Sequence, residues 1–156
     1  MRRRRAQTQE LTADPKFKNK TVAKFINIVM LKGKKPLAER IVYGAFESLK
    51  KELNEQDVIK IFNKALDNAR PRLEVKPRRV GGATYQVPVE VRQDRGVSIA
   101  MRWIRDFAKN KKGKPMKDKL ADEILAAYKG EGSVIKKRDD THKMAEANKA
   151  FAHFRW

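Results

Sequence analysis

The residues of this sequence whose types and spacing could do chemistry are its lysines and arginines. They gather at residues 2–5, 32–35, 76–79, 109–114 and 136–138. One such run is usually a solvated face, but here 38 Lys and Arg residues stand against 19 Asp and Glu residues, for a formal net charge of +19. That charge opposes a compact state unless a polyanion offsets it. Phosphate binding releases condensed counterions, so the pattern favours nucleic acid as the partner over an anionic membrane surface.

Residues typical of catalysis or metal binding are few. The sequence has no cysteine and two histidines, His142 and His153, so it predicts no metal site of familiar spacing. Asp139 and Asp140 would point apart on a helix, and the cations around them make charge pairing the simpler interpretation. We therefore expect no metal, no cofactor and no enzymatic activity, with an enzyme of unrecognised site as the remaining alternative.

Length and hydropathy predict one domain. The 156 residues, 40% of them hydrophobic, suffice for a single buried core. No apolar run approaches the length of a membrane span, and no apolar region follows the N-terminal charges, so we expect neither a membrane segment nor a signal peptide. The lack of cysteine is compatible with a reducing cytoplasm, where we expect the protein to work.

Helices are expected to position the basic runs. Apolar residues recur at helical spacing over residues 21–31, 36–53, 58–69, 94–108 and 116–128. We predict that these five amphipathic helices form one core, with basic runs at the turns between them. A sixth helix over residues 133–150 has a thin apolar stripe. Because a helix that is polar nearly all round needs support from outside the core, we expect it to dock on a neighbouring molecule.

Residues 71–91 carry the β periodicity of the chain. Apolar and polar residues alternate on either side of Gly81-Gly82, and a glycine pair supplies the positive φ angles of a tight hairpin turn. Pro77 and Pro88 cannot donate to a ladder and are expected at outward-facing positions. A two-stranded ribbon alone is marginal in water, so it must pack on the helices or on a partner. The predicted fold is mainly α, a bundle of about six helices with a protruding two-stranded antiparallel β-ribbon between the third and fourth helices.

Both ends of the chain are predicted to project from one domain that spans residues 1–156. Residues 1–20 are expected to form a basic extended arm that follows a phosphate backbone, the alternative being a solvated tail. Residues 151–156 contain three aromatics, a histidine and an arginine, which suit either stacking on bases or packing on a protein neighbour. Between the ends, residues 21–70 form helices one to three, residues 71–91 the hairpin, and residues 94–150 helices four to six.

RNA is favoured over DNA because the sequence has no recognition-helix pattern, zinc finger or basic zipper to enter a major groove. Scattered basic patches also suit the irregular surface of a folded RNA. If about eight phosphates are neutralised, log affinity should fall with log salt at a slope of about −7 on duplex and about −6 on single strands. The alternative is a nucleoid DNA-bending protein of the HU type, which is also small and basic with β-arms.

The residues that we predict to contact RNA are the basic ones at the turns and projections. They are Arg2, Arg3, Arg4, Arg5, Lys32, Lys34, Lys35, Arg70, Arg72, Lys76, Arg78, Arg79, Arg92, Arg95, Arg102, Arg105, Lys109, Lys111, Lys112, Lys114, Lys136, Lys137, Arg138 and Lys143. Arginines among them offer bidentate phosphate contacts and planar surfaces for unpaired bases.

Several motifs resemble a known family. Residues 78–91 are Arg-Arg-Val-Gly-Gly-Ala-Thr-Tyr-Gln-Val-Pro-Val-Glu-Val, and residues 144–156 are Met-Ala-Glu-Ala-Asn-Lys-Ala-Phe-Ala-His-Phe-Arg-Trp. Together with residues 14–17 (Asp-Pro-Lys-Phe), 33–35 (Gly-Lys-Lys) and 100–103 (Ala-Met-Arg-Trp), they resemble the family of bacterial small-subunit ribosomal protein number seven. The resemblance spans essentially the whole chain.

This resemblance implies a helix bundle with a protruding ribbon that binds the three-prime major domain of small-subunit ribosomal RNA and nucleates assembly of the subunit head. It also implies that the ribbon and the C-terminal helix lie near the exit site for transfer RNA, beside messenger RNA, with ribosomal protein number eleven among the neighbours. Some bacterial members repress the messenger of their own operon. The residues expected near the exit site or a protein neighbour are Tyr85, Asn148, Phe151, His153, Phe154, Arg155 and Trp156.

Overall fold

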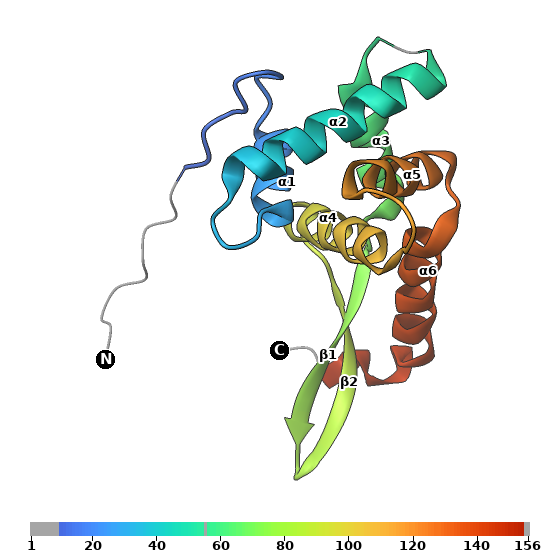
Figure 1. Ribbon diagram of the computed structural model, residues 1–156. Coiled ribbons are helices and arrows are strands. Elements are labelled where there is room, and N and C mark those ends of the chain that lie inside the picture. The colour runs from blue at the N-terminus through green and yellow to red at the C-terminus, as the bar shows by residue number, and fades with distance from the viewer. Residues whose placement is uncertain (1–9, 55, 155–156) are drawn as a thin grey trace.

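A helical bundle carries a long β-ribbon on its lower side (Figure 1). The computed structural model describes residues 10–54 and 56–154. In chain order the elements are α1 (Lys20–Val29), α2 (Lys35–Leu53), α3 (Val58–Ala69), β1 (Leu73–Val80), β2 (Ala83–Glu90), α4 (Gln93–Asn110), α5 (Met116–Lys129), α6 (Gly132–Ala147) and the 3-10 helix η1 (Lys149–Phe154). The predicted fold class, mainly α with an antiparallel ribbon between the third and fourth helices, is confirmed.

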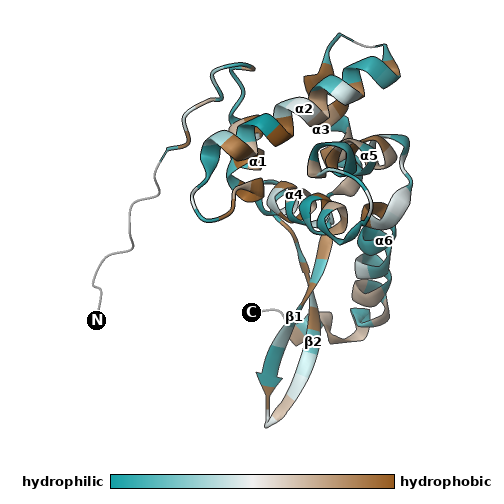
Figure 2. Cartoon of the chain, viewed as in Figure 1, coloured by the Kyte–Doolittle hydropathy of each residue, from teal (hydrophilic) through white to brown (hydrophobic). Residues whose placement is uncertain are grey.

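The core is built where the apolar stripes of the first five helices meet, and Figure 2 shows that each of these helices mixes hydrophobic and hydrophilic residues. Phe62 of α3 lies at its centre, with ring centroids 5.1 Å from Phe25 of α1 and 5.3 Å from Phe46 of α2. Helix α5 packs against α2, α3 and α4 and buries Leu120 and Ile124 completely. Burial of each large apolar side chain stabilises the fold by about 1.5–3 kcal/mol.

Helix α1 ends earlier than its apolar pattern predicts. We expected it to run to Leu31, but it stops at Val29, and Met30 already has an extended ψ of 135°. Lys32 and Gly33 then take left-handed φ angles of 52° and 73°, which turn the chain into α2. The periodicity could not show this stop, because Met30 still packs against the core from outside the helix.

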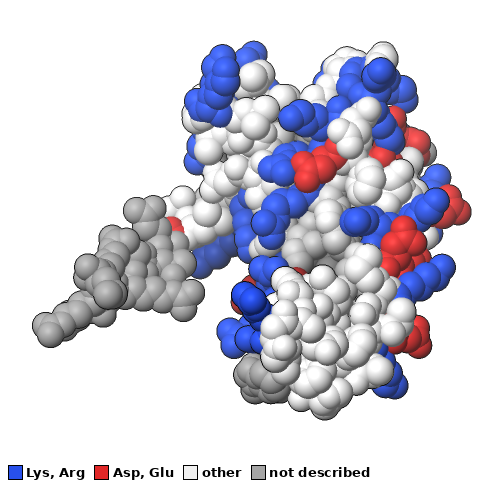
Figure 3. Space-filling view, turned by 90° about the horizontal axis from the view of Figure 1, so that it is seen from below, with Lys and Arg blue, Asp and Glu red and all other residues white. Residues whose placement is uncertain are grey.

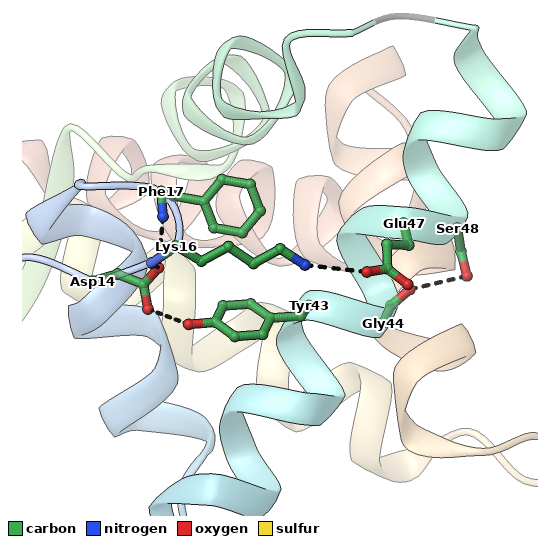
Figure 4. A network of polar contacts seen from close by, with 7 residues as sticks. All are labelled: Asp14, Lys16, Phe17, Tyr43, Gly44, Glu47 and Ser48. Carbon is green, nitrogen blue, oxygen red and sulfur yellow. Dashed lines mark hydrogen bonds and ion pairs between the residues drawn. The ribbon is translucent and has the colours of Figure 1, made fainter.

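The second half of the predicted N-terminal arm is folded rather than extended. Asp14 is buried (3% exposed), accepts a hydrogen bond of 2.6 Å from the Tyr43 hydroxyl, and accepts two more from the backbone N–H groups of Lys16 and Phe17 (Figure 4). Phe17 packs edge-on against Tyr43 and Phe46. An isolated aspartate and one aromatic leave no periodic signal, so sequence analysis missed this anchor. Residues 1–9, including Arg2, Arg3, Arg4 and Arg5, lie outside the described residues.

The ribbon closes on a two-residue turn. Gly81 and Gly82 have φ angles of 56° and 90°, positive at both positions as a type I′ turn requires. Val80 therefore pairs with Ala83, and each odd-numbered residue of β1 pairs with an even-numbered residue of β2. The two apolar series consequently lie on opposite faces, with Leu73 opposite Glu90 and Val75 opposite Pro88, while Tyr85, Val87 and Val89 lie opposite Arg78, Lys76 and Glu74.

The C-terminal part of the same chain packs against both strands of the ribbon. Helix α6 packs along β1, and its Ala145 lines a cavity together with Leu73 and Pro88 of the ribbon. The 3-10 helix η1 then curls back onto β2, where Phe151 and Phe154 contact Tyr85 (Figure 1). We expected the polar sixth helix to dock on a neighbour; Val134, Ile135 and Ala145 are buried within its own chain, while Met144 is exposed.

Candidate nucleic-acid interface

The predicted RNA contacts divide into cations that hold the fold together and cations that remain exposed. At the base of the ribbon, Arg95 of α4 forms a two-pronged contact with Glu74 of β1, Nε to Oε1 at 3.0 Å and Nη2 to Oε2 at 2.9 Å. Lys76 adds a contact of 3.3 Å to the same carboxylate. Burial alone would raise the pKa of Glu74, but the hydrogen bonds from Arg95 and Lys76 outweigh it and lower the pKa. Arg95 therefore serves to fix the ribbon on α4.

The lysine-rich loop between α4 and α5 shows the same division. Lys111 Nζ lies 2.7 Å from Oε1 of Glu123, whose residue is only 2% exposed, and Lys114 Nζ lies 2.9 Å from Asp122. The hydrogen bond and charge of Asp122 raise the pKa of Lys114. Two neighbouring acidic residues of α5 thus form ion pairs with two of the lysines in this stretch. The other two predicted contacts in the loop, Lys109 and Lys112, are exposed and form no ion pair among the described residues.

Four more predicted contacts also bridge helices or join neighbouring residues. Arg105 of α4 donates to the carbonyl of Ile28 in α1 at 3.2 Å and pairs with Asp106. Arg138 of α6 donates to the carbonyl of Asn68 in α3 and pairs with Asp139 at 2.6 Å. Arg70 lies 3.6 Å from Asp67, and Arg102 donates to the carbonyl of Ser98 within α4. Asp139 therefore makes the charge pair that the sequence suggested.

The remaining predicted contacts lie at turns, at the ribbon tip and on the outer face of α6. Figure 3 shows basic side chains on both sides of the uncharged surface at the end toward which the ribbon points, while acidic side chains lie mainly on the right of that view. Apart from Arg102, the predicted contacts in the described part of the chain that are exposed and have no ion-pair partner there are Lys32, Lys34, Lys35, Arg72, Arg79, Arg92, Lys109, Lys112, Lys136, Lys137 and Lys143. Arg78 is exposed next to Arg79, opposite Tyr85.

Sequence analysis missed Arg40, which is exposed on α2 one turn beyond the Lys32–Lys35 run. It stands alone between other residue types, so a search for runs passes over it. No local pattern marks it, because it follows Lys35 by five residues, which is not a spacing that places two side chains on one helix face.

The aromatic residues near the C-terminus contact one another and Tyr85 of the ribbon. The centroid of the Tyr85 ring lies 5.2 Å from that of Phe151 and 5.1 Å from that of Phe154, and the His153 and Phe154 rings lie tilted against each other with centroids 4.0 Å apart. Asn148 caps α6 by donating to the carbonyl of Met144 at 2.8 Å. Arg155 and Trp156 lie outside the described residues.

Other chemistries find no support in the described part of the chain. No three His, Asp or Glu side chains of residues 10–54 and 56–154 come together as a metal-binding group. None of the described helices is both long enough and apolar enough to cross a bilayer.

Comparisons with known proteins point the same way. A family model described as ribosomal protein S7p/S5e matches residues 1–149. The small ribosomal subunit protein uS7 of Thermotoga maritima is 56% identical over 156 residues, 100% of both chains. The proteins of the same name from Anaeromyxobacter sp. (strain Fw109-5) and Francisella philomiragia are each 57% identical over 155 residues, 99% of both chains.

Proposed function

This chain belongs to the ribosomal protein S7p/S5e family, and from that premise we propose that it binds the three-prime major domain of small-subunit ribosomal RNA directly and nucleates assembly of the subunit head. As a ribosomal protein of the small subunit, it works within a ribonucleoprotein. The alternative of an HU-type DNA-bending protein is not retained, because the family match covers residues 1–149.

One observation carries the proposal of direct RNA binding. Acidic side chains pair with basic residues that join elements, such as Arg95 and Lys111, but not with the exposed lysines of the turn between α1 and α2. Lys32, Lys34 and Lys35 crowd one turn without an ion pair among the described residues. Holding like charges together costs free energy, and a phosphate backbone offsets that cost.

The ribbon and the C-terminal segment are proposed to reach the exit site for transfer RNA, beside messenger RNA, with ribosomal protein number eleven as a neighbour. What supports this is the projection of the ribbon beyond the bundle, with Arg78 and Arg79 exposed near its tip (Figure 1). A projection that carries cations at its end can contact a partner that the bundle does not reach. We propose that the protein is cytoplasmic, as part of the ribosome.

Charge reversal at matched sites tests the proposal. We compare the double variants K34E/K35E and K50E/K51E, which change net charge equally, in filter binding to a fragment of the three-prime major domain. Glu suits the helix dipole at Lys34 and Lys35, where α2 begins, but opposes it at Lys50 and Lys51 in the last turn, so the unfolding temperatures of both variants are measured first. We expect K34E/K35E to lose much more affinity for the RNA fragment. The slope of log affinity against log salt should also become shallower by about two phosphate contacts, at about 0.7–0.9 per contact. Equal losses of affinity in the two variants would contradict the assignment of Lys34 and Lys35 as RNA contacts.

The identity of the RNA is tested separately. The unmodified protein is titrated with the three-prime major domain, with a five-prime domain fragment of equal length and with duplex DNA, all at the same salt. We expect the three-prime major domain to bind most tightly, because scattered cations match one folded surface better than a uniform charge density. Indistinguishable affinities would contradict a specific role in head assembly.

A further inference from the structure

An apolar hollow of about 210 Å³ opens at the turn between α1 and α2. Val29, Ala38 and Ile41 belong to its lining, and Val29 and Ala38 are buried. Leu31 and Leu37 also line it, yet they are 65% and 45% exposed. Together with Met144 they are the large apolar side chains that the described residues leave exposed. Exposed apolar groups that meet around a concavity indicate a binding site rather than chance exposure.

The hollow is held open by the backbone. Helix α1 stops at Val29, and the left-handed residues Lys32 and Gly33 carry the chain across to α2. The N–H of Lys34 donates to the carbonyl of Leu31 at 3.0 Å, and the N–H of Lys35 donates to that of Gly33 at 2.8 Å. Because these bonds fix the turn, Leu31 cannot close over the hollow by continuing the helix. A preformed site binds without the cost of ordering a loop.

Positive charge stands around the same opening. Lys32 and Lys34 line the hollow, Lys35 follows, and no acidic residue is part of the lining. All three lysines are exposed and free of ion pairs among the described residues. A fitting ligand therefore combines a small apolar body with an attached anion. The lining offers no side chain that accepts a hydrogen bond, so the body is gripped by shape and burial rather than by a pattern of polar contacts.

We propose that this hollow receives one unpaired base of the bound RNA, with its flanking phosphates on Lys32 and Lys34. The inference rests on the RNA binding proposed above and adds the class of contact made at this turn. Flipped bases pack between aromatic or apolar side chains, and single-stranded segments of folded RNA present such bases. The volume falls below the roughly 300–1,000 Å³ of pockets for drug-sized ligands, which suits one flat ring system. A protein partner would need acidic side chains beside its apolar one, whereas RNA carries phosphate at every nucleotide.

The first test removes the apolar walls and leaves the charge. L31S/L37S is compared with M144S, which removes an exposed apolar side chain on α6, in filter binding to the three-prime major domain fragment. Both sites are exposed, and unfolding temperatures confirm that the variants fold. We expect L31S/L37S to lose about tenfold in affinity, the lower part of the range for stacking one base, with an unchanged salt slope. M144S should bind as the unmodified protein does.

The second test locates the base. Reagents that modify unpaired bases should find one base protected by the unmodified protein and reactive in the L31S/L37S complex, while backbone cleavage around it stays protected. An unchanged affinity or an unchanged base pattern in L31S/L37S would overturn the hollow as a base site, although the proposed function would stand if K34E/K35E still weakened binding. Loss of binding to another small-subunit protein instead of to RNA would also overturn it. Failure of the unmodified protein to select the fragment would overturn the proposed function itself.

Discussion

The backbone N–H of Arg72 donates a hydrogen bond to Nε2 of His142, with 2.9 Å between the two nitrogens. The carbonyl of Arg72 accepts a second bond, from the N–H of Val91 at 2.9 Å. Both backbone groups of the residue that leads into β1 are therefore occupied, one by α6 and one by Val91, the residue that follows β2 at the base of the ribbon. Only an unprotonated Nε2 can accept, so this link between α6 and the ribbon depends on the charge of His142.

Acid should loosen this link. Burial, and then the positive charge of Arg138, lower the pKa of His142 below its usual 6.5, against a smaller opposing effect of Asp139. As the pH falls, the unfolded chain therefore binds the proton before the folded one does. The stabilisation is fully present above the unfolded pKa of 6.5 and is lost as the pH falls through and below that value.

The measurement is the unfolding temperature at pH 7.5 and at pH values below 6.5, for the unmodified protein and for H142Q. The glutamine side chain can accept from the Arg72 N–H but does not titrate in this range. We expect H142Q to lose less stability on acidification than the unmodified protein. An equal drop in both proteins would show that other groups cause the acid sensitivity.

The contact between Tyr85 and Phe151 should be measurable as a coupling. Their ring centroids lie 5.2 Å apart, and such aromatic pairs contribute about 0.5–1.5 kcal/mol beyond their buried area. A double-mutant cycle of Y85A, F151A and the double variant should give a coupling free energy of unfolding in that range. Q86A, on the neighbouring exposed position of β2, serves as the control and should show no coupling to F151A.

Lys111 and Lys112 are adjacent but should behave oppositely. K111M leaves the carboxylate of Glu123 buried without its cation, and Oε2 of that carboxylate already has no hydrogen-bond partner among the described residues. Removing one partner of a fully buried pair costs about 3–5 kcal/mol, and we expect about 1–3 here because Lys111 is 39% exposed. K112M should leave the free energy of unfolding unchanged and weaken RNA binding. Urea titration and filter binding of both variants decide whether Lys111 holds the fold or the RNA.

Gly130 and Gly132 offer a matched pair at the junction of α5 and α6. Both have left-handed φ angles, 80° and 89°, so replacement by alanine strains the backbone of each by about 1–2 kcal/mol. A Cβ on Gly130 meets nothing within 4 Å, whereas a Cβ on Gly132 would lie 2.9 Å from the Cβ of Ala126. We therefore expect G132A to destabilise the protein by about 1–3 kcal/mol more than G130A, in chemical denaturation. Equal losses would mean that the junction relaxes without cost.

The helices and the ribbon could be predicted because repeated patterns encode them. Phe25, Phe46 and Phe62 each lie on the buried apolar face of a different helix, and Gly81-Gly82 marks a turn that needs positive φ angles. The end of α1 could not be predicted, because Met30 fits both the helical pattern and the extended residue that it is.

The roles of single cations were beyond the sequence for another reason. Lys111 and Lys112 are identical in type and adjacent, and only the distant Glu123 separates their tasks. The packing of the last segment was equally hidden, since Phe151 finds Tyr85 across 66 positions of the chain. In both cases the residue that determines the role lies in a different element, so no local sequence pattern indicates the contact.

The packing of α6 and η1 against the ribbon determines when the ribbon becomes rigid during synthesis of the chain. Translation adds about 5–20 residues per second, so the 66 residues from Tyr85 to Phe151 take about 3–13 s to make. Until then the ribbon lacks its contact with η1, and an isolated hairpin of two strands is barely stable in water. We expect the ribbon to become rigid only when the chain is nearly complete. A nascent protein truncated before residue 149 would therefore present a flexible ribbon to its partners.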